Sequence, residues 1–444
     1  MRGEGSGRSR DMMSFAETLS ETRRRHCRRI AVTSTMFGCI STQLIESNAL
    51  VVLYLTMLGG SDSFTMFSSS LTSLSNILLL IPCASLAAGW GIRRTYTTSS
   101  AIGFCAFLLI AAAPYLGPAA KYAVIAGCFI YALTLTIYAS TWYPLLDNIL
   151  TPADRNGFFS RMRFCYMLFN AGLLFVLGKF LGADPPLWLL QGVFLLAGSA
   201  LWGRKFCMDR LPLDPAMQRE SPNLPKTLGI CLRNRPLVGF SLYLCAVYLA
   251  FSAALPLSLI RMKTALGIPD GAIVLLTSVN LVGKLAGFWA LGRWGNRVSL
   301  RWQMIGTHGL ALLTVGLLFT LGPGTPYLTP LFALGFFLLG MVTAFLMCTS
   351  AVGMLALAAP GNKIMAIAFC STSLSAGAAA GTLGCTFLLG SGLLTSISNG
   401  ISSGIDKFQL LFALECLALV LFAALLPLVP ARKKEDAPAP PREK

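Results

Sequence analysis

The strongest constraint on this chain is the repetition of long apolar runs between residues 30 and 430. A helix needs about 20 apolar residues to cross a bilayer, and with its loop each pass takes roughly 30 residues, so this region holds about twelve passes. Only 12% of the residues are charged, about half of the roughly 25% found in soluble domains. Barrel strands alternate and seldom form such runs. We therefore predict an all-α membrane protein with twelve transmembrane helices.

The predicted helices end where apolar sequence gives way to polar sequence: 30–57, 66–89, 97–116, 121–146, 163–181, 187–204, 237–260, 270–292, 302–322, 328–355, 364–390 and 408–430. Five prolines make residues 205–236 a linker, in which 226–232 can form a short helix. The predicted organisation is a cytoplasmic segment at 1–29, six-helix bundles at 30–204 and 237–430 on either side of this linker, and a cytoplasmic tail at 431–444.

The net charge of +17 is unevenly placed. With the N-terminus inside, 29 of the 35 Lys and Arg residues fall in inner segments or at the span ends that adjoin them, counting Arg163 and Arg204, as the positive-inside rule expects. This bias predicts a multi-pass protein of the cytoplasmic (plasma or inner) membrane with both termini in the cytoplasm. It also favours anionic membrane lipids over nucleic acid as partners of the basic clusters. The first apolar run, about 28 residues long, exceeds the 7–15 of a signal-peptide core, so we expect no cleaved signal.

No enzyme signature is found in the sequence. It has no Walker loop, no HExxH, no nucleophile elbow and only two histidines. The 13 cysteines lie in predicted spans or inner segments, and none forms a CxxC pair. We therefore predict a protein that is not an enzyme and uses no cofactor and no metal.

The two halves of the chain resemble each other. The first span of each half begins at residues 30 and 237, an offset of about 207. Basic residues with glycine follow the second span of each half, and Pro152 and Pro360 open the loops after the fourth. Nearly equal offsets of about 200–208 indicate an internal repeat, and therefore two similar bundles.

These features together resemble the major facilitator superfamily over residues 30–430. The loop after the eighth span is similar to that family's G-x-L-A-D-R-x-G-R-R pattern through Arg293, Gly295 and Arg297, with Gly292 where the family has Asp. The loop after the fourth span matches P-x-x-R-x-x-x-x-S-R through Pro152, Arg155, Ser160 and Arg161. The resemblance implies gating loops here, and glycines such as Gly91, Gly292 and Gly295 would permit tight inner turns. Asp147 with Arg161 or Arg163 is a plausible inner latch, or these are solvated topogenic charges.

Ionisable residues inside spans are costly and face the interior or a wet cavity. They are Glu46, Lys284, His308 and Glu415. The resemblance implies that helices 9 and 12 are peripheral, which favours packing roles for His308 and Glu415. Glu46 lies near the midplane of span 1, and a buried carboxyl there could load and release a proton. The alternatives are a structural hydrogen bond for Glu46 and, for Lys284, either an anionic substrate or Glu46 as partner.

Polar and aromatic side chains of the predicted cavity-lining spans suit an amphipathic organic solute. The predicted substrate-binding set is Lys284, Gln43, Asn280, Tyr131, Thr134, Tyr138, Asn170 and Tyr243. In the alternative reading, the hydroxyl residues join helices and the tyrosines belong to interface belts.

The predicted function is secondary active transport of a small organic solute by alternating access in a monomer. A proton, carried by Glu46, is the predicted coupling ion and favours symport, with sodium as the alternative. Two rivals keep the fold: an exporter of amphipathic compounds, and a lipid scramblase or transport-dead sensor.

Overall fold

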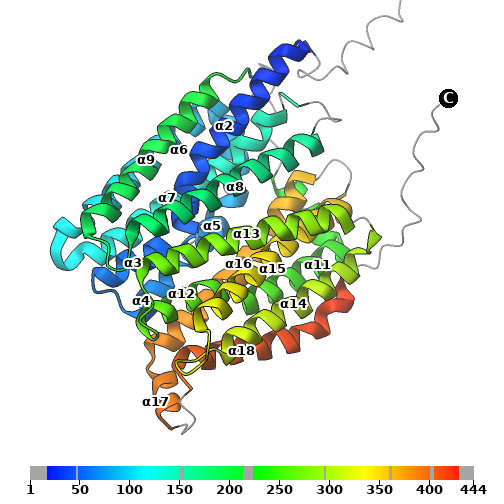
Figure 1. The fold of residues 1–444 in the computed structure, drawn as a ribbon. Helices are drawn as coiled ribbons and strands as arrows, with labels where there is room; N and C mark the ends of the chain where they lie inside the picture. The colour runs from blue at the N-terminus through cyan, green and yellow to red at the C-terminus, as the bar shows by residue number, and fades with distance from the viewer. Residues whose placement is uncertain are drawn as a thin grey trace, which may run out of the picture. The chain divides into compact units, whose positions relative to one another are not determined.

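The structure is a computed structural model of the whole chain, and it describes residues 18–46, 49–147, 149–150, 155–213, 224–294, 297–359, 363–400 and 405–429. All long regular elements in these ranges are helices (Figure 1). The chain packs as two compact units: residues 1–60, 78–173 and 184–222 form the first, and 61–77, 174–183 and 223–444 the second. The predicted division at the 205–236 linker stays a prediction.

The first unit is built around four long helices that pack along one another. Figure 1 shows α2 beside α9 and α6 beside α7. Its elements are α2 (Glu21–Glu46), α3 (Ala49–Met57), α6 (Ile92–Ala112), η1 (Ala113–Ala119), α7 (Ala120–Asp147) and α9 (Leu187–Asp209), with parts of α5 (Leu71–Trp90) and α8 (Arg155–Leu181).

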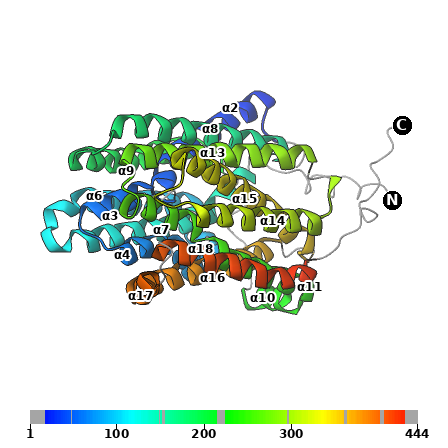
Figure 2. The ribbon, with the colours of Figure 1, turned by 60° about the horizontal axis from the view of Figure 1, so that its bottom comes forward.

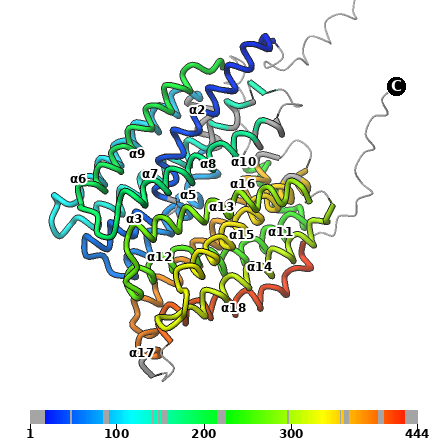
Figure 3. Tube along the Cα trace, viewed as in Figure 1, coloured from blue at the N-terminus to red at the C-terminus, as the bar shows by residue number. Residues whose placement is uncertain are grey.

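The second unit pairs α13 with α15 and α11 with α16, and α18 covers α11 and α14 (Figures 2 and 3). It contains the start of α5 and the end of α8. Its other elements are α4 (Asp62–Ser68), α10 (Leu224–Arg233), α11 (Arg235–Phe251), α12 (Ala254–Thr264), α13 (Asp270–Trp294), α14 (Leu300–Thr320), α15 (Leu328–Leu357), α16 (Lys363–Gly390), α17 (Leu393–Gly400), α18 (Lys407–Phe422) and η4 (Ala423–Leu428).

The helices confirm the predicted fold class of an all-α, multi-pass membrane protein. By length and composition ten helical runs could cross a membrane, or eleven with the bent pair α2 and α3. One of the ten, residues 92–139, has 48 residues and contains α6 and most of α7. Gly117 separates these two helices with a non-helical φ of 55° and ψ of −124°. Counting them separately brings the described spans to the twelve expected.

Three local predictions were wrong. Helix α2 begins at Glu21 rather than near residue 30, because Glu21 pairs with Arg24, Arg25 and Arg28 and stabilises a polar first turn. Helix α9 runs to Asp209 rather than ending at Arg204.

The third error concerns glycine in the inner loops. Gly91 does open α6 with a positive φ of 81°, as a tight turn requires. Gly292, in contrast, lies inside α13, so the predicted turn at that position is absent. The linker prediction was better, since the proposed short helix at 226–232 is α10.

Close helix contacts in the second unit depend on glycine. A Cβ atom built on Gly283 would lie 2.0 Å from the Phe337 carbonyl oxygen, and one on Gly340 would lie 2.0 Å from that of Asn280. Gly377 and Gly381 approach the backbone of α11 in the same way, with 2.0 and 2.2 Å to carbonyl oxygens. This small-xxx-small pair therefore lets α16 pack closely against α11.

Candidate functional site

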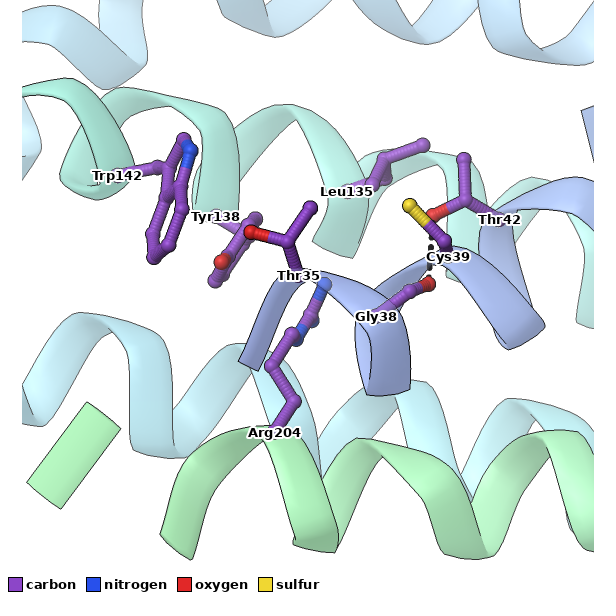
Figure 4. A pocket seen from close by; sticks show the side chains of 8 residues that line it. All are labelled: Thr35, Gly38, Cys39, Thr42, Leu135, Tyr138, Trp142 and Arg204. Atoms are coloured by element: carbon purple, nitrogen blue, oxygen red, sulfur yellow. Dashed lines mark hydrogen bonds between the residues drawn. The ribbon is translucent and has the colours of Figure 1, made fainter. Parts of the chain in front are cut away.

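A hollow of about 90 Å³ opens inside the first unit between α2, α7 and α9 (Figure 4). Most of the side chains that line it are polar or aromatic. The residues that line it are Thr35, Gly38, Cys39 and Thr42 of α2, Leu135, Tyr138 and Trp142 of α7, and Arg204 of α9. A water needs roughly 10–15 Å³ of such space, so a compact group of several atoms fits here. A pocket that encloses a whole drug-sized ligand is larger, roughly 300–1,000 Å³.

Arg204 is the charged group of the hollow. Its side chain reaches from α9 towards Tyr138 and Thr35 (Figure 4), and the residue is only 3% exposed. The guanidinium carbon lies 3.7 Å from the centre of the Tyr138 ring, a cation–π contact. The buried Nε has no hydrogen-bond partner. Among the described residues no carboxylate forms an ion pair with Arg204, so within this part of the chain only the Tyr138 ring faces its charge.

The packing of α2 on α9 places Arg204. Small residues of α2 face α9: Ser34 Oγ donates to the Arg204 carbonyl oxygen at 3.3 Å, and Ser41 Oγ to that of Ala197 at 2.5 Å. A Cβ atom at Gly38 would lie 2.7 Å from Cδ of Arg204. Glycine at this position therefore leaves room for the arginine stem to pass α2 and enter the hollow.

The polar stripe predicted on α7 divides between two roles. Tyr138 lines the hollow, and the Tyr131 hydroxyl lies 3.1 Å from that of Thr42, which also lines it. Thr134 is buried and donates to the Tyr131 carbonyl oxygen at 2.7 Å. Its own carbonyl accepts from Ser99 of α6 at 2.7 Å. Thr134 thus packs between helices, as the alternative reading of the hydroxyl residues expects.

The other predicted residues of the first unit are not among those that line the hollow. Gln43 is half-buried on α2. Asn170 of α8 is buried, and its Oδ1 has no partner. Glu46 is the last residue of α2, and its side chain lies outside the described part of the structure.

In the second unit, two of the predicted substrate residues bond to neighbouring helices. The Asn280 amide donates to the Phe336 carbonyl oxygen of α15 at 3.0 Å. The Tyr243 hydroxyl lies 3.4 Å from Nδ1 of His308, a residue of α14. Both are at most 2% exposed, so each contributes to packing in this structure. Lys284 is half-buried on α13. Their substrate-binding roles stay predictions.

The two ionisable residues assigned to packing behave differently. His308 Nε2 lies 2.7 Å from the Leu419 carbonyl oxygen of α18, so the ring ties three helices together. Glu415, 5% exposed, has both carboxyl oxygens buried without a hydrogen-bond partner.

The predicted gating residues are mostly exposed or undescribed. Arg161, Arg293 and Arg297 are exposed. Gly295 and the side chains of Asp147 and Arg155 lie outside the described part of the structure. The inner latch therefore stays a prediction.

Arg204 was missed because it was counted among the inner, topogenic charges. The sequence did contain a signal for its burial, because Arg204 continues the apolar stripe of α9 at helical spacing. The buried positions of α9 include Leu190, Phe194, Ala197, Leu201, Arg204 and Met208, spaced by three or four residues. A basic residue in the apolar stripe of a helix is buried unless the helix ends before it.

Comparison with solved structures covers almost the whole chain. A mutant of the nucleoside transporter NupG aligns with a TM-score of 0.71 and 13% identity, over 90% of this chain and 99% of that chain. The chain has the major facilitator superfamily fold. The D-xylose-proton symporter shares this fold with a TM-score of 0.69 and 12% identity, over 91% and 97% of the two chains. A POT family transporter in complex with 5-aminolevulinic acid aligns with a TM-score of 0.67 and 12% identity, over 90% of this chain and 96% of that chain.

No family model matches the chain, and no curated protein matches it. The major facilitator fold is therefore established by the structure, and the sequence motifs agree with it.

Proposed function

We propose that this protein is a secondary active transporter that moves a small organic solute across the cytoplasmic membrane by alternating access. The observation that carries the proposal is the likeness to NupG and to the D-xylose-proton symporter over at least 90% of this chain. Both of those proteins are transporters by name, and this chain has the same arrangement of helices over nearly the full length of each. The membrane, the inner location of both termini and action as a monomer belong to the same proposal.

Contacts inside the second unit support the existence of a closed end. Helix α4, from the N-terminal half of the sequence, packs against α16. Ser63 Oγ donates to the Thr386 carbonyl oxygen at 3.0 Å, and Lys407 Nζ lies 2.5 Å from an oxygen of Asp62. The basic-residue bias assigns these ends to the outer side. In an alternating-access cycle such contacts form in one state and break in the other.

We propose a proton as the coupling ion and Glu46 as its carrier. Glu46 is the last residue of α2, which forms a bent pair with α3, and transporters place ion and substrate sites at discontinuous helices near the bilayer midplane. Sodium remains the rival coupling ion, since side-chain oxygens could bind it.

The decisive experiment is uptake into proteoliposomes against a panel of metabolites, with and without a pH gradient. A pH gradient should drive accumulation of at least one solute. The gradient imposed in each direction separates import from export, which tests the exporter alternative. No movement of any solute, with lipid translocation in the same vesicles, would replace the proposal by the scramblase reading.

The Glu46→Gln variant tests coupling. Glutamine imitates the protonated carboxyl, so the variant should lose gradient-driven accumulation but keep solute exchange, which needs no proton release. Glu415→Gln is the matched control, because it neutralises a buried carboxyl of α18 and should leave accumulation intact. Accumulation by Glu46→Gln at the wild-type level would contradict the role of Glu46. Loss of accumulation in Glu415→Gln alone would move that role to α18.

A further inference from the structure

We infer that the hollow of the first unit binds an anionic oxygen group, a carboxylate or a phosphate, through Arg204. The starting point is an unbalanced charge. Arg204 is only 3% exposed, its Nε has no hydrogen-bond partner, and no described carboxylate pairs with it, so no described anionic group offsets its desolvation. Buried charges in folded proteins are normally paired. The missing partner of Arg204 is therefore expected to come from outside the chain.

The geometry selects the chemistry of that partner. Tyr138 covers one face of the guanidinium at 3.7 Å, and the N–H donors lie in the plane of the group, where Nε has no partner among the described residues. A planar fork of donors matches the two oxygens of a carboxylate or phosphate. Trp142 also lines the hollow and carries an indole N–H, which can only donate. The volume of about 90 Å³ admits a compact head group, so a larger ligand would leave its remainder outside.

Residues of α2 hold Arg204 in place at the hollow. The stem of Arg204 passes Gly38 where a Cβ atom would lie 2.7 Å from its Cδ. Ser34 bonds the arginine's own carbonyl oxygen, which fixes the helix position from which the side chain starts. Either a soluble organic anion or the head group of an anionic lipid could supply the same oxygens. The use of this site during transport rests on the proposed function, but the binding itself does not.

The test compares thermal unfolding of the full-length purified protein in acetate or inorganic phosphate with unfolding in chloride at equal ionic strength. A ligand that binds only the folded state raises the unfolding midpoint by a few degrees at about 100 times its dissociation constant. We expect this rise in the wild-type protein and its loss in Arg204→Met. Arg204→Lys keeps the charge without the fork, so it should show a smaller rise. Arg210→Gln removes a charge from the same end of α9 but not from the hollow, and should respond like the wild type.

Arg204→Met should also fold well without any anion, because it replaces an unpaired buried charge with an apolar chain of similar length. Its midpoint in chloride should therefore equal or exceed that of the wild type. A second arm uses nanodiscs of phosphatidylcholine with or without phosphatidylglycerol. An Arg204-dependent rise with phosphatidylglycerol alone identifies a lipid head group as the source, and a rise with acetate or phosphate identifies a soluble anion.

An equal response of Arg204→Met and wild type to every anion and lipid would overturn the inference. This outcome is distinct from failure of the transport proposal. Anion binding without transport of any solute would leave the site standing and remove the transporter reading. Transport of neutral solutes, with no Arg204-dependent anion binding, would leave the transporter proposal standing and remove the anion site.

Discussion

Arg261 shows how a buried charge is compensated when the protein supplies the partners. Its side chain is fully buried, and Nε donates to Asp406 at 2.8 Å. Its other nitrogens donate to the Leu318 carbonyl oxygen at 3.1 Å and to that of Leu321. The same Asp406 caps α18 through its second oxygen, which accepts from the backbone of Phe408 and Gln409. One carboxylate therefore joins the end of α12 to the start of α18.

Asp406→Asn separates these two tasks. Asparagine keeps the oxygen that caps the helix but leaves Arg261 as an uncompensated buried charge, so we expect a loss of about 3–5 kcal/mol in the free energy of unfolding. Asp406→Ala should cost about 1 kcal/mol more because the cap is also lost. The measurement is denaturant unfolding in detergent. The control is Lys205→Gln, which breaks a partly exposed pair and should cost about 1 kcal/mol or less. Equal costs for Lys205→Gln and Asp406→Asn would refute this account.

At the scale of elements, the α13 and α15 pair depends on two glycines that let the backbones touch. Gly340→Ala places a methyl group where the Asn280 carbonyl oxygen lies, at 2.0 Å. Backbone cannot yield as a side chain does, so the helices must part, and we expect a loss of at least about 3 kcal/mol in unfolding free energy.

Gly309→Ala is the matched control for Gly340→Ala. Gly309 lies in α14 with no atom within 4 Å of the added Cβ, so alanine should stabilise its helix by about 0.5–1 kcal/mol. Unfolding of both variants in the same detergent gives the comparison. A Gly340→Ala protein as stable as wild type would show that the two helices tolerate separation.

At the scale of the whole molecule, the contact of Asp62 with Lys407 should respond to conformational state. Asp62→Asn or Lys407→Gln should weaken the closed end and speed labelling of a Ser63→Cys reporter by an impermeant reagent applied outside. The exchanged pair, Asp62→Lys with Lys407→Asp, should slow labelling again because the attraction is restored. Labelling that is indifferent to all three changes would show that this pair does not hold the end closed.

Topology has a simple test in Cys207. This residue is half-buried near the C-terminal end of α9, which the proposed orientation places inside, so an impermeant thiol reagent should label it only from the cytoplasmic side. Cys27 and Cys231 are buried and should remain unlabelled in the folded protein. Labelling of Cys207 from outside intact cells would reverse the proposed orientation.

The sequence alone was enough for the fold class, and for most helix positions to within a few residues. The reason is that crossing a bilayer depends on hydropathy summed over about 20 residues, which needs no knowledge of neighbours. Errors in helix ends arose where polar residues continue a helix, as in the first turns of α2 with Glu21 and the last turns of α9 beyond Arg204.

The tertiary structure decided which polar side chains share a site. Asn280 and Tyr243 carry suitable groups, yet their hydrogen bonds run to neighbouring helices. Arg204 belonged by sequence to a basic cluster, yet it enters a hollow because Gly38, 166 residues earlier, lets it pass. Such an outcome depends on how two distant helices register against each other. Register is set by packing between small side chains. Hydropathy summed over a stretch of about 20 residues therefore cannot predict it.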